Sequence, residues 1–115
     1  MLRKKALVVL SGCCATLLAP AVHAECNNYI CEDVKILTLV TNAEGNVLVR
    51  TAGTTANLGC ALEGGTYMTL KASSTRFKEI YANLLAFQVA DRPISVRIEI
   101  GVAGCPIVYV YGNTP

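Results

Sequence analysis

The chain has 115 residues, with ten Lys and Arg against eight Asp and Glu, a single His and no Trp. This length allows one small domain with a limited core. Beyond the first few residues, the basic side chains are scattered from Lys35 to Arg97, which argues against the basic patch expected of a nucleic-acid-binding protein.

The first 24 residues have the three parts of an export signal. Residues 3–5 are basic, residues 6–18 are largely apolar, and Val22-His23-Ala24 has the small-x-small pattern of a cleavage site. Cleavage would leave 91 of the 115 residues, without the only His, and with seven Lys and Arg against eight Asp and Glu. We therefore predict a periplasmic or secreted protein, with residues 1–24 removed and residues 25–115 forming a single disulfide-stabilised domain.

An alternative N-terminus is a lipoprotein anchor. Leu10-Ser11-Gly12-Cys13 resembles a bacterial lipobox, in which Cys13 would be lipidated. The apolar run before Cys13 is very short and the hydrophobic stretch continues through Leu18, so the sequence favours cleavage after Ala24. After the signal no stretch approaches 18 apolar residues, and no transmembrane segment is expected in the mature chain.

Four cysteines follow the signal: Cys26, Cys31, Cys60 and Cys105. An even number in a small exported domain predicts two disulfides, although three pairings are possible. We favour Cys26 with Cys31, closing a small loop, and Cys60 with Cys105, tying the middle of the chain to its end. The cysteine spacings are not typical of zinc sites and the mature chain has no His, so no metal or other cofactor is expected.

The first half of the mature chain predicts three strands. Residues 25–33 are polar and are expected to lie against the domain as a disulfide-linked arm. Residues 34–41 (VKILTLVT) and 47–51 (VLVRT) are rich in β-branched residues and predict a hairpin around the turn NAEGN. Residues 66–70 (TYMTL) predict a third strand after two glycines.

The second half predicts one helix and two strands. Apolar residues recur at helical spacing over Phe77–Gln88, and Ser73–Thr75 offer N-cap hydroxyls. Pro93 ends the helix. Residues 94–100 alternate between apolar and polar, and residues 106–111 (PIVYVY) predict the last strand.

This order is that of an OB-fold: a five-stranded antiparallel, partly closed barrel with one helix between the third and fourth strands. A flat α+β sheet with the helix packed across one face explains the same order. We expect the small OB-like barrel of the two.

Two resemblances agree with a β-rich exported protein. The segment FKEIYANLLAFQVADRPISVRIEI (77–100) resembles the corresponding part of the B subunit of subtilase-type AB5 toxins, in which a helix with a Tyr and leucines also leads into a V-R-I strand. This resemblance implies an OB-fold and a pentameric glycan-binding subunit. The mature chain also resembles small exported bacterial proteins of unassigned function, through Glu44-Gly45, Cys60, I-Y-x-x-L-L-A (80–86), V-R-I (96–98) and G-C-x-I (104–107).

No catalytic residue is predicted. Without a His the usual base for a Ser or Cys nucleophile is missing, and oxidised cysteines supply no thiolate. The acidic pair Glu32-Asp33 lies in the polar arm, where solvated carboxylates are expected. Residues 101–104 (GVAG) predict a turn between strands rather than a phosphate site, because no helix follows them.

The ligand-binding residues are unknown from the sequence. Arg97 and Glu99 share the polar face of their strand, where solvation or pairing with a neighbouring strand is the default. Tyr109 and Tyr111 share one face of the last strand, and core packing or a subunit contact is expected before a sugar platform. The sequence favours an exported, non-catalytic binding module for an unknown protein or surface glycan, as a monomer or a homo-oligomer. The alternative is a lectin-like, ring-forming glycan-binding subunit similar to AB5 B subunits.

Overall fold

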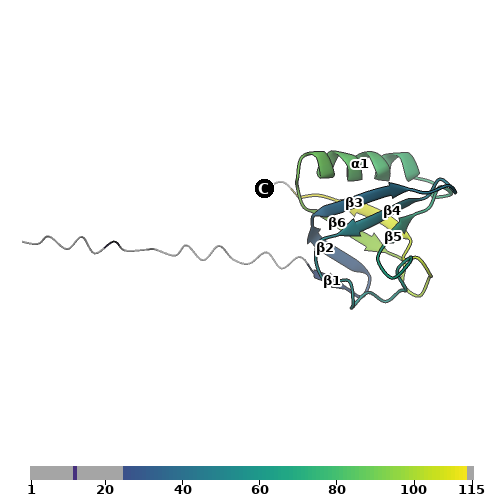
Figure 1. Ribbon diagram of the computed structural model, residues 1–115, viewed down its shortest axis with the longest axis horizontal. Coiled ribbons are helices and arrows are strands. Elements are labelled where there is room, and N and C mark those ends of the chain that lie inside the picture. The colour runs from purple at the N-terminus through teal and green to yellow at the C-terminus, as the bar shows by residue number, and fades with distance from the viewer. Residues whose placement is uncertain (1–11, 13–24, 114–115) are drawn as a thin grey trace, which may run out of the picture.

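The computed structural model describes Gly12 and residues 25–113 (Figure 1). The predicted cleavage site after Ala24 and the lipobox cysteine Cys13 lie outside the described residues. Within this range the chain forms one helix, α1 (Phe77–Val89), and seven strands: β1 (Glu25–Asn27), β2 (Ile30–Val34), β3 (Ile36–Thr41), β4 (Val47–Thr51), β5 (Met68–Leu70), β6 (Ile94–Ile98) and β7 (Ile107–Tyr111).

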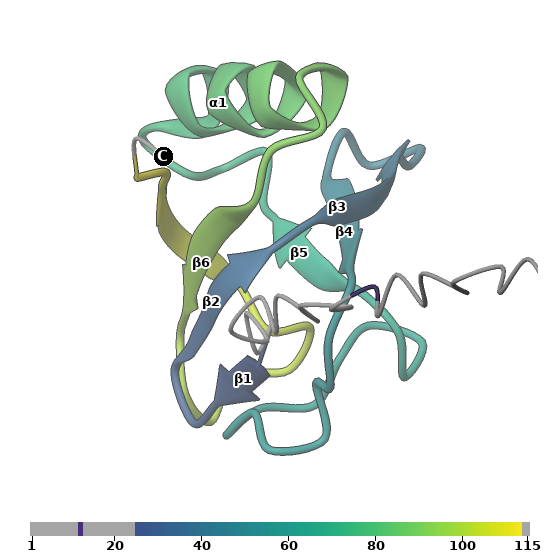
Figure 2. The ribbon, with the colours of Figure 1, turned by 90° about the vertical axis from the view of Figure 1, so that its left-hand side faces the viewer.

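The strands form two antiparallel sheets, ordered β1-β2-β6-β7 and β3-β4-β5. Only Lys35 separates β2 from β3, so one continuous length of chain contributes to both sheets (Figure 2). A parallel bridge between Thr69 and Pro106 links β5 to the start of β7. The predicted β-rich fold with one helix is confirmed, whereas the two sheets are not closed into a barrel.

The prediction of a polar arm over residues 25–33 is wrong. These residues form the β1–β2 hairpin, and β2 pairs with β6 inside the four-stranded sheet. The reason lies in the alternation of side chains: Cys26 and Cys31 face each other across the hairpin and are buried, while Glu25 and Glu32 lie on its outer side. The two cysteines pack as small apolar residues, so this segment has a buried side although most of its residues are polar.

Two disulfide bonds join Cys26 to Cys31 and Cys60 to Cys105, the pairs favoured from the sequence. Inward-facing side chains of both sheets and of the helix form one core. Burying each large apolar side chain contributes about 1.5–3 kcal/mol. The fully buried core side chains are Val34, Val47, Val49, Met68, Leu70, Leu84, Ile94, Val96 and Ile98, with Cys26, Cys31 and Cys105.

The helix begins later than its predicted caps. Its N-cap residue is Arg76, without a side-chain cap hydrogen bond, so the prediction that the hydroxyls of residues 73–75 cap it is wrong. The backbone closes the turn instead, because the N–H of Phe77 donates to the carbonyl of Ser74 at 3.1 Å. The helix packs against β3 and β7 through Ile80 and Leu84 and lies across one end of the two sheets (Figures 1 and 2).

A β-bulge sets the orientation of the last strand. Ile98 pairs with Ile107 and Arg97 pairs with Tyr109, which leaves Val108 as an extra residue on β7. An extra residue reverses the alternation of side chains beyond it. As a result Ile107 is buried in the core, whereas Tyr109 and Tyr111 face outward.

Candidate binding face

The register of the four-stranded sheet aligns one row of outward side chains across all its strands. Asn27 pairs with Ile30, Ile30 with Arg97, and Arg97 with Tyr109. The residues beside this row on β1, β2 and β6 are the buried Cys26, Cys31 and Val96. The outer face of this sheet is therefore a regular surface with a core-facing layer directly beneath it.

Two tyrosines flank Arg97 on this face, and a third tyrosine packs against one of them. The guanidinium carbon of Arg97 lies 4.8 Å from the ring centroid of Tyr29 and 5.7 Å from that of Tyr109. Its Nη1 also donates to the Tyr109 hydroxyl at 3.5 Å, and the rings of Tyr109 and Tyr111 are 6.2 Å apart with a tilt of 39°. We call Tyr29, Arg97, Tyr109 and Tyr111 the tyrosine–arginine cluster.

The backbone fixes the position of Tyr29 in this cluster. Tyr29 lies in the turn of the β1–β2 hairpin, where Asn28 has a positive φ of 51°. The N–H of Ile98 donates to the carbonyl of Tyr29 at 2.9 Å, one residue beyond Arg97, and the Cys26–Cys31 disulfide closes the hairpin below. The ring of Tyr29 is thus held beside Arg97 by the sheet itself.

The cluster is accessible and Arg97 is not neutralised by a carboxylate of the described residues. Tyr29, Tyr109 and Tyr111 expose 41%, 43% and 39% of their surface, which rules out core packing for the two tyrosines of β7. The prediction that Tyr109 and Tyr111 share one face is confirmed. Within residues 25–113, Arg97 forms cation–π contacts and one weak hydrogen bond but no ion pair.

A polar pocket of about 490 Å³ adjoins the cluster and shares Tyr29 with it. Glu32 lines this pocket. Asp33 is partly buried instead, and its backbone N–H donates to the Ser95 hydroxyl at 3.1 Å. The structure therefore separates the two residues of the predicted acidic pair. The pocket is lined by Glu25, Asn27, Asn28, Tyr29, Ile30 and Glu32.

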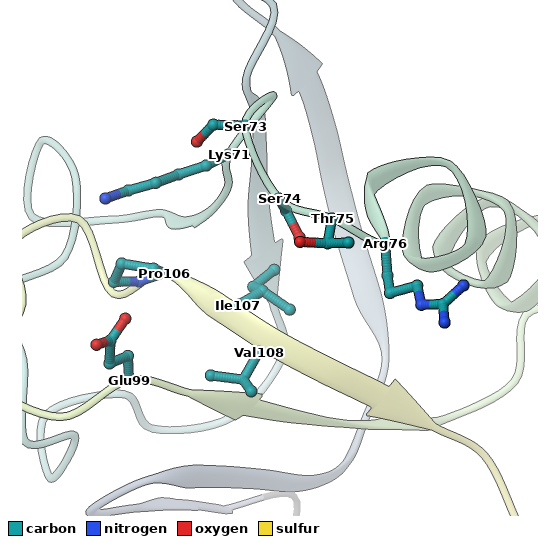
Figure 3. Close-up of a pocket in the computed structure, with 9 residues that line it drawn as sticks. All are labelled: Lys71, Ser73, Ser74, Thr75, Arg76, Glu99, Pro106, Ile107 and Val108. Atoms are coloured by element: carbon teal, nitrogen blue, oxygen red, sulfur yellow. The ribbon is translucent and has the colours of Figure 1, made fainter.

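A second cavity of about 380 Å³ lies between the loop that precedes α1 and the start of β7 (Figure 3). Figure 3 shows Lys71 and Glu99 at one end of it and Arg76 at the other. Because β6 ends at Ile98, Glu99 lines this cavity rather than lying beside Arg97, so the structure does not bring together the two polar residues of the predicted strand.

The glycines of residues 101–104 form a turn, as the sequence predicts. Gly101 and Gly104 both have positive φ, and their N–H groups donate to the carbonyls of Gly59 and Ala61. These amides are consequently engaged within the fold rather than available to a phosphate.

Sequence reasoning missed Tyr29, because it lies in a segment predicted to be a polar arm. The signal that could have found it is an aromatic residue between two closely spaced cysteines. In the part of the chain that the structure describes, no group of three or more His, Cys, Asp or Glu side chains is placed to hold a metal ion. Among the same residues, no helix has the length and hydrophobicity needed to cross a membrane.

Comparison of the chain with models of protein families, with curated proteins and with solved structures finds no match. The resemblance to the B subunits of subtilase-type toxins therefore rests on the sequence of residues 77–100 alone.

Proposed function

We propose that the protein is an exported, non-catalytic binding module that recognises its partner through the tyrosine–arginine cluster. The observation that carries this proposal is a group of three partly exposed tyrosine rings, two of which contact an arginine that has no carboxylate partner in residues 25–113. Tyr and Arg are enriched at the centres of protein interfaces, where rigid rings exclude water and a guanidinium provides directed hydrogen bonds.

The strand order supports an OB-like barrel as the scaffold of this module. Counting β2 and β3 as one bent strand, and leaving aside the three-residue β1, gives five strands with α1 between the third and the fourth. In the sheet orders this fifth strand, β7, pairs with the fourth, β6, and the bridge between Thr69 and Pro106 links it to the third, β5. These neighbours support an OB-like arrangement of the five strands. On this scaffold the cluster occupies an outer sheet face, away from the core.

Export is supported by the two disulfides and by the signal-like N-terminus. Disulfides persist in oxidising compartments such as the bacterial periplasm. Both cysteine pairs are bonded, so neither provides a thiolate for catalysis. These features suit a stable domain that meets its partner outside the cytosol.

Site-specific crosslinking in the producing cell tests the proposal. A photo-reactive benzoyl-phenylalanine at position 111 should form a discrete adduct, because Tyr111 lies in the cluster and is partly exposed. The matched control is the same group at position 50, where Arg50 is exposed on the three-stranded sheet and donates to the Thr38 hydroxyl. Equal adducts at both positions, or none at position 111, would contradict the proposal.

A lectin-like subunit is the second candidate, favoured by the exposed ring pair of Tyr109 and Tyr111. Aromatic rings of this kind offer an apolar surface to a sugar. A glycan array tests this function directly, with Tyr111→Ala expected to abolish any binding. Light scattering measures the mass of the purified protein in solution, and a ring-forming lectin should have several times the mass of the monomer.

A further inference from the structure

The outer face of the four-stranded sheet carries a cation and an anion on neighbouring strands. Arg97 on β6 and Glu32 on β2 lie on neighbouring strands, because Ile30 pairs with Arg97 and Glu32 follows two residues later. Within the described residues neither side chain has an ion-pair partner. Glu32 lies directly opposite Glu25 in the β1–β2 hairpin and is itself exposed.

A face with a cation and an anion side by side is complementary to itself. In a two-fold symmetric dimer each residue i that contacts residue j of the partner receives the reciprocal contact. An axis between the two charges would bring Arg97 of each copy to Glu32 of the other. It would also stack the partly exposed tyrosines of the two clusters around these ion pairs.

We propose that the partner of this face is a second copy of the same chain, joined by two reciprocal Arg97–Glu32 ion pairs. This inference rests on the proposed function, since it names the occupant of the same face. The fork of the guanidinium suits a carboxylate, and the surrounding rings would lower the exposure of each pair to water.

The sheet edges favour face-to-face contact over addition of a strand. The outer edge of β1 is occupied by the loop that follows β4, because the N–H groups of Cys26 and Asn28 donate to the carbonyls of Thr54 and Asn57. The start of β7 is bridged to β5 through Thr69. The edge of β1 and the residue that precedes β7 are thus occupied by contacts within the fold, whereas Tyr29, Tyr109 and Tyr111 on the outer face stay partly exposed.

The proposed dimer contact is small, so its affinity should be low. Three partly exposed tyrosines and two ion pairs bury less than the roughly 800 Å² per partner of a stable complex. We therefore expect a dimer that forms at high protein concentration and dissociates on dilution.

Charge reversal with rescue tests the proposal in sedimentation velocity over a wide concentration series, on the protein purified from the periplasm. The parent should approach twice the monomer mass at the highest concentration. Arg97→Glu and Glu32→Arg should each weaken dimerisation at least tenfold, since each places like charges opposite one another. The double variant should dimerise again, because the arginine introduced on β2 would then meet the glutamate introduced on β6 of the other copy. Arg50→Glu on the three-stranded sheet is the control and should leave the mass unchanged.

The outcomes separate this inference from the proposed function. A monomer at every concentration overturns the dimer, while an adduct of different mass at position 111 would still support a binding face. A dimer that ignores both single reversals, or a double variant that does not recover, also overturns the dimer. A mass of several subunits overturns it in favour of a ring. Melting curves check that the variants fold, and Arg97→Gln, which removes the charge without reversing it, should still weaken dimerisation.

Discussion

The two faces of the four-stranded sheet use alternate residues of the same strands for different purposes. On the inner face of β6, Val96 and Ile98 are at most 1% exposed and belong to the core. Between them Arg97 faces outward and contacts two tyrosine rings. Core packing and exposure therefore alternate over Val96, Arg97 and Ile98, and in our proposal the exposed side serves recognition. Substitutions on the inner face should change the free energy of unfolding, and those on the outer face should change binding.

The two disulfides provide the largest expected effects on stability. Cys60–Cys105 closes a separation of 45 residues, whereas Cys26–Cys31 closes one of 5. In the loop-entropy model, replacing both cysteines by Ser should cost about 4 kcal/mol for the long loop and about 2 kcal/mol for the short one. Urea unfolding of the two double variants measures the difference.

The same two variants sharpen the comparison of the faces. Loss of Cys26–Cys31 loosens the hairpin that carries Tyr29, so it should weaken face-to-face dimerisation more than its smaller stability cost suggests. The Cys60–Cys105 variant leaves that hairpin closed. Equal unfolding free energies in the two variants would show that loop length does not control the stability of this domain.

A single inner-face substitution should have an effect similar in size to the loss of one disulfide. Ile98→Ala removes a side chain that is 1% exposed, and such a cavity costs about 2–5 kcal/mol. Val108→Ala is the matched control on the adjacent strand, because Val108 is 48% exposed and should change stability by no more than about 0.5 kcal/mol. Similar midpoints of thermal unfolding for the two variants would mean that the inward and outward sides of this sheet have been misassigned.

Local patterns predicted the elements whose side chains alternate without interruption. Ile94–Ile98 and the helix over Phe77–Val89 were found because a core-facing apolar period is visible in each. The hairpin of residues 25–33 was missed, because its inward residues are cysteines in a polar segment.

The candidate site was harder to predict, since it depends on pairing between distant residues. The bulge at Val108 follows from the register of β7 against β6, not from the composition of either strand. Likewise, Tyr29 approaches Arg97 only because β2 pairs with β6. Sequence alone placed Tyr109 and Tyr111 on one face but left open whether that face was the core.

The smallest expected effect on the free energy of unfolding is that of the contact between Arg97 and Tyr29 on the outer face. The stacking of Arg97 on Tyr29 is a partly exposed cation–π contact, for which about 0.5–1 kcal/mol is typical. Tyr29→Ala and Arg97→Ala should each lower the unfolding free energy by no more than about 1 kcal/mol. The coupling energy from the double-mutant cycle should account for most of this loss. The cycle is measured at low protein concentration, where the proposed dimer would dissociate.

A second cycle with Arg97→Ala and Tyr111→Ala is its control. The ring of Tyr111 contacts Tyr109 rather than the guanidinium, so its coupling to Arg97 should lie near zero. If the first cycle also gives zero, Tyr29 and Arg97 do not hold each other in the free protein. The cluster would then be organised only by the partner that binds it, and the outer face would differ from the inner one in rigidity as well as in exposure.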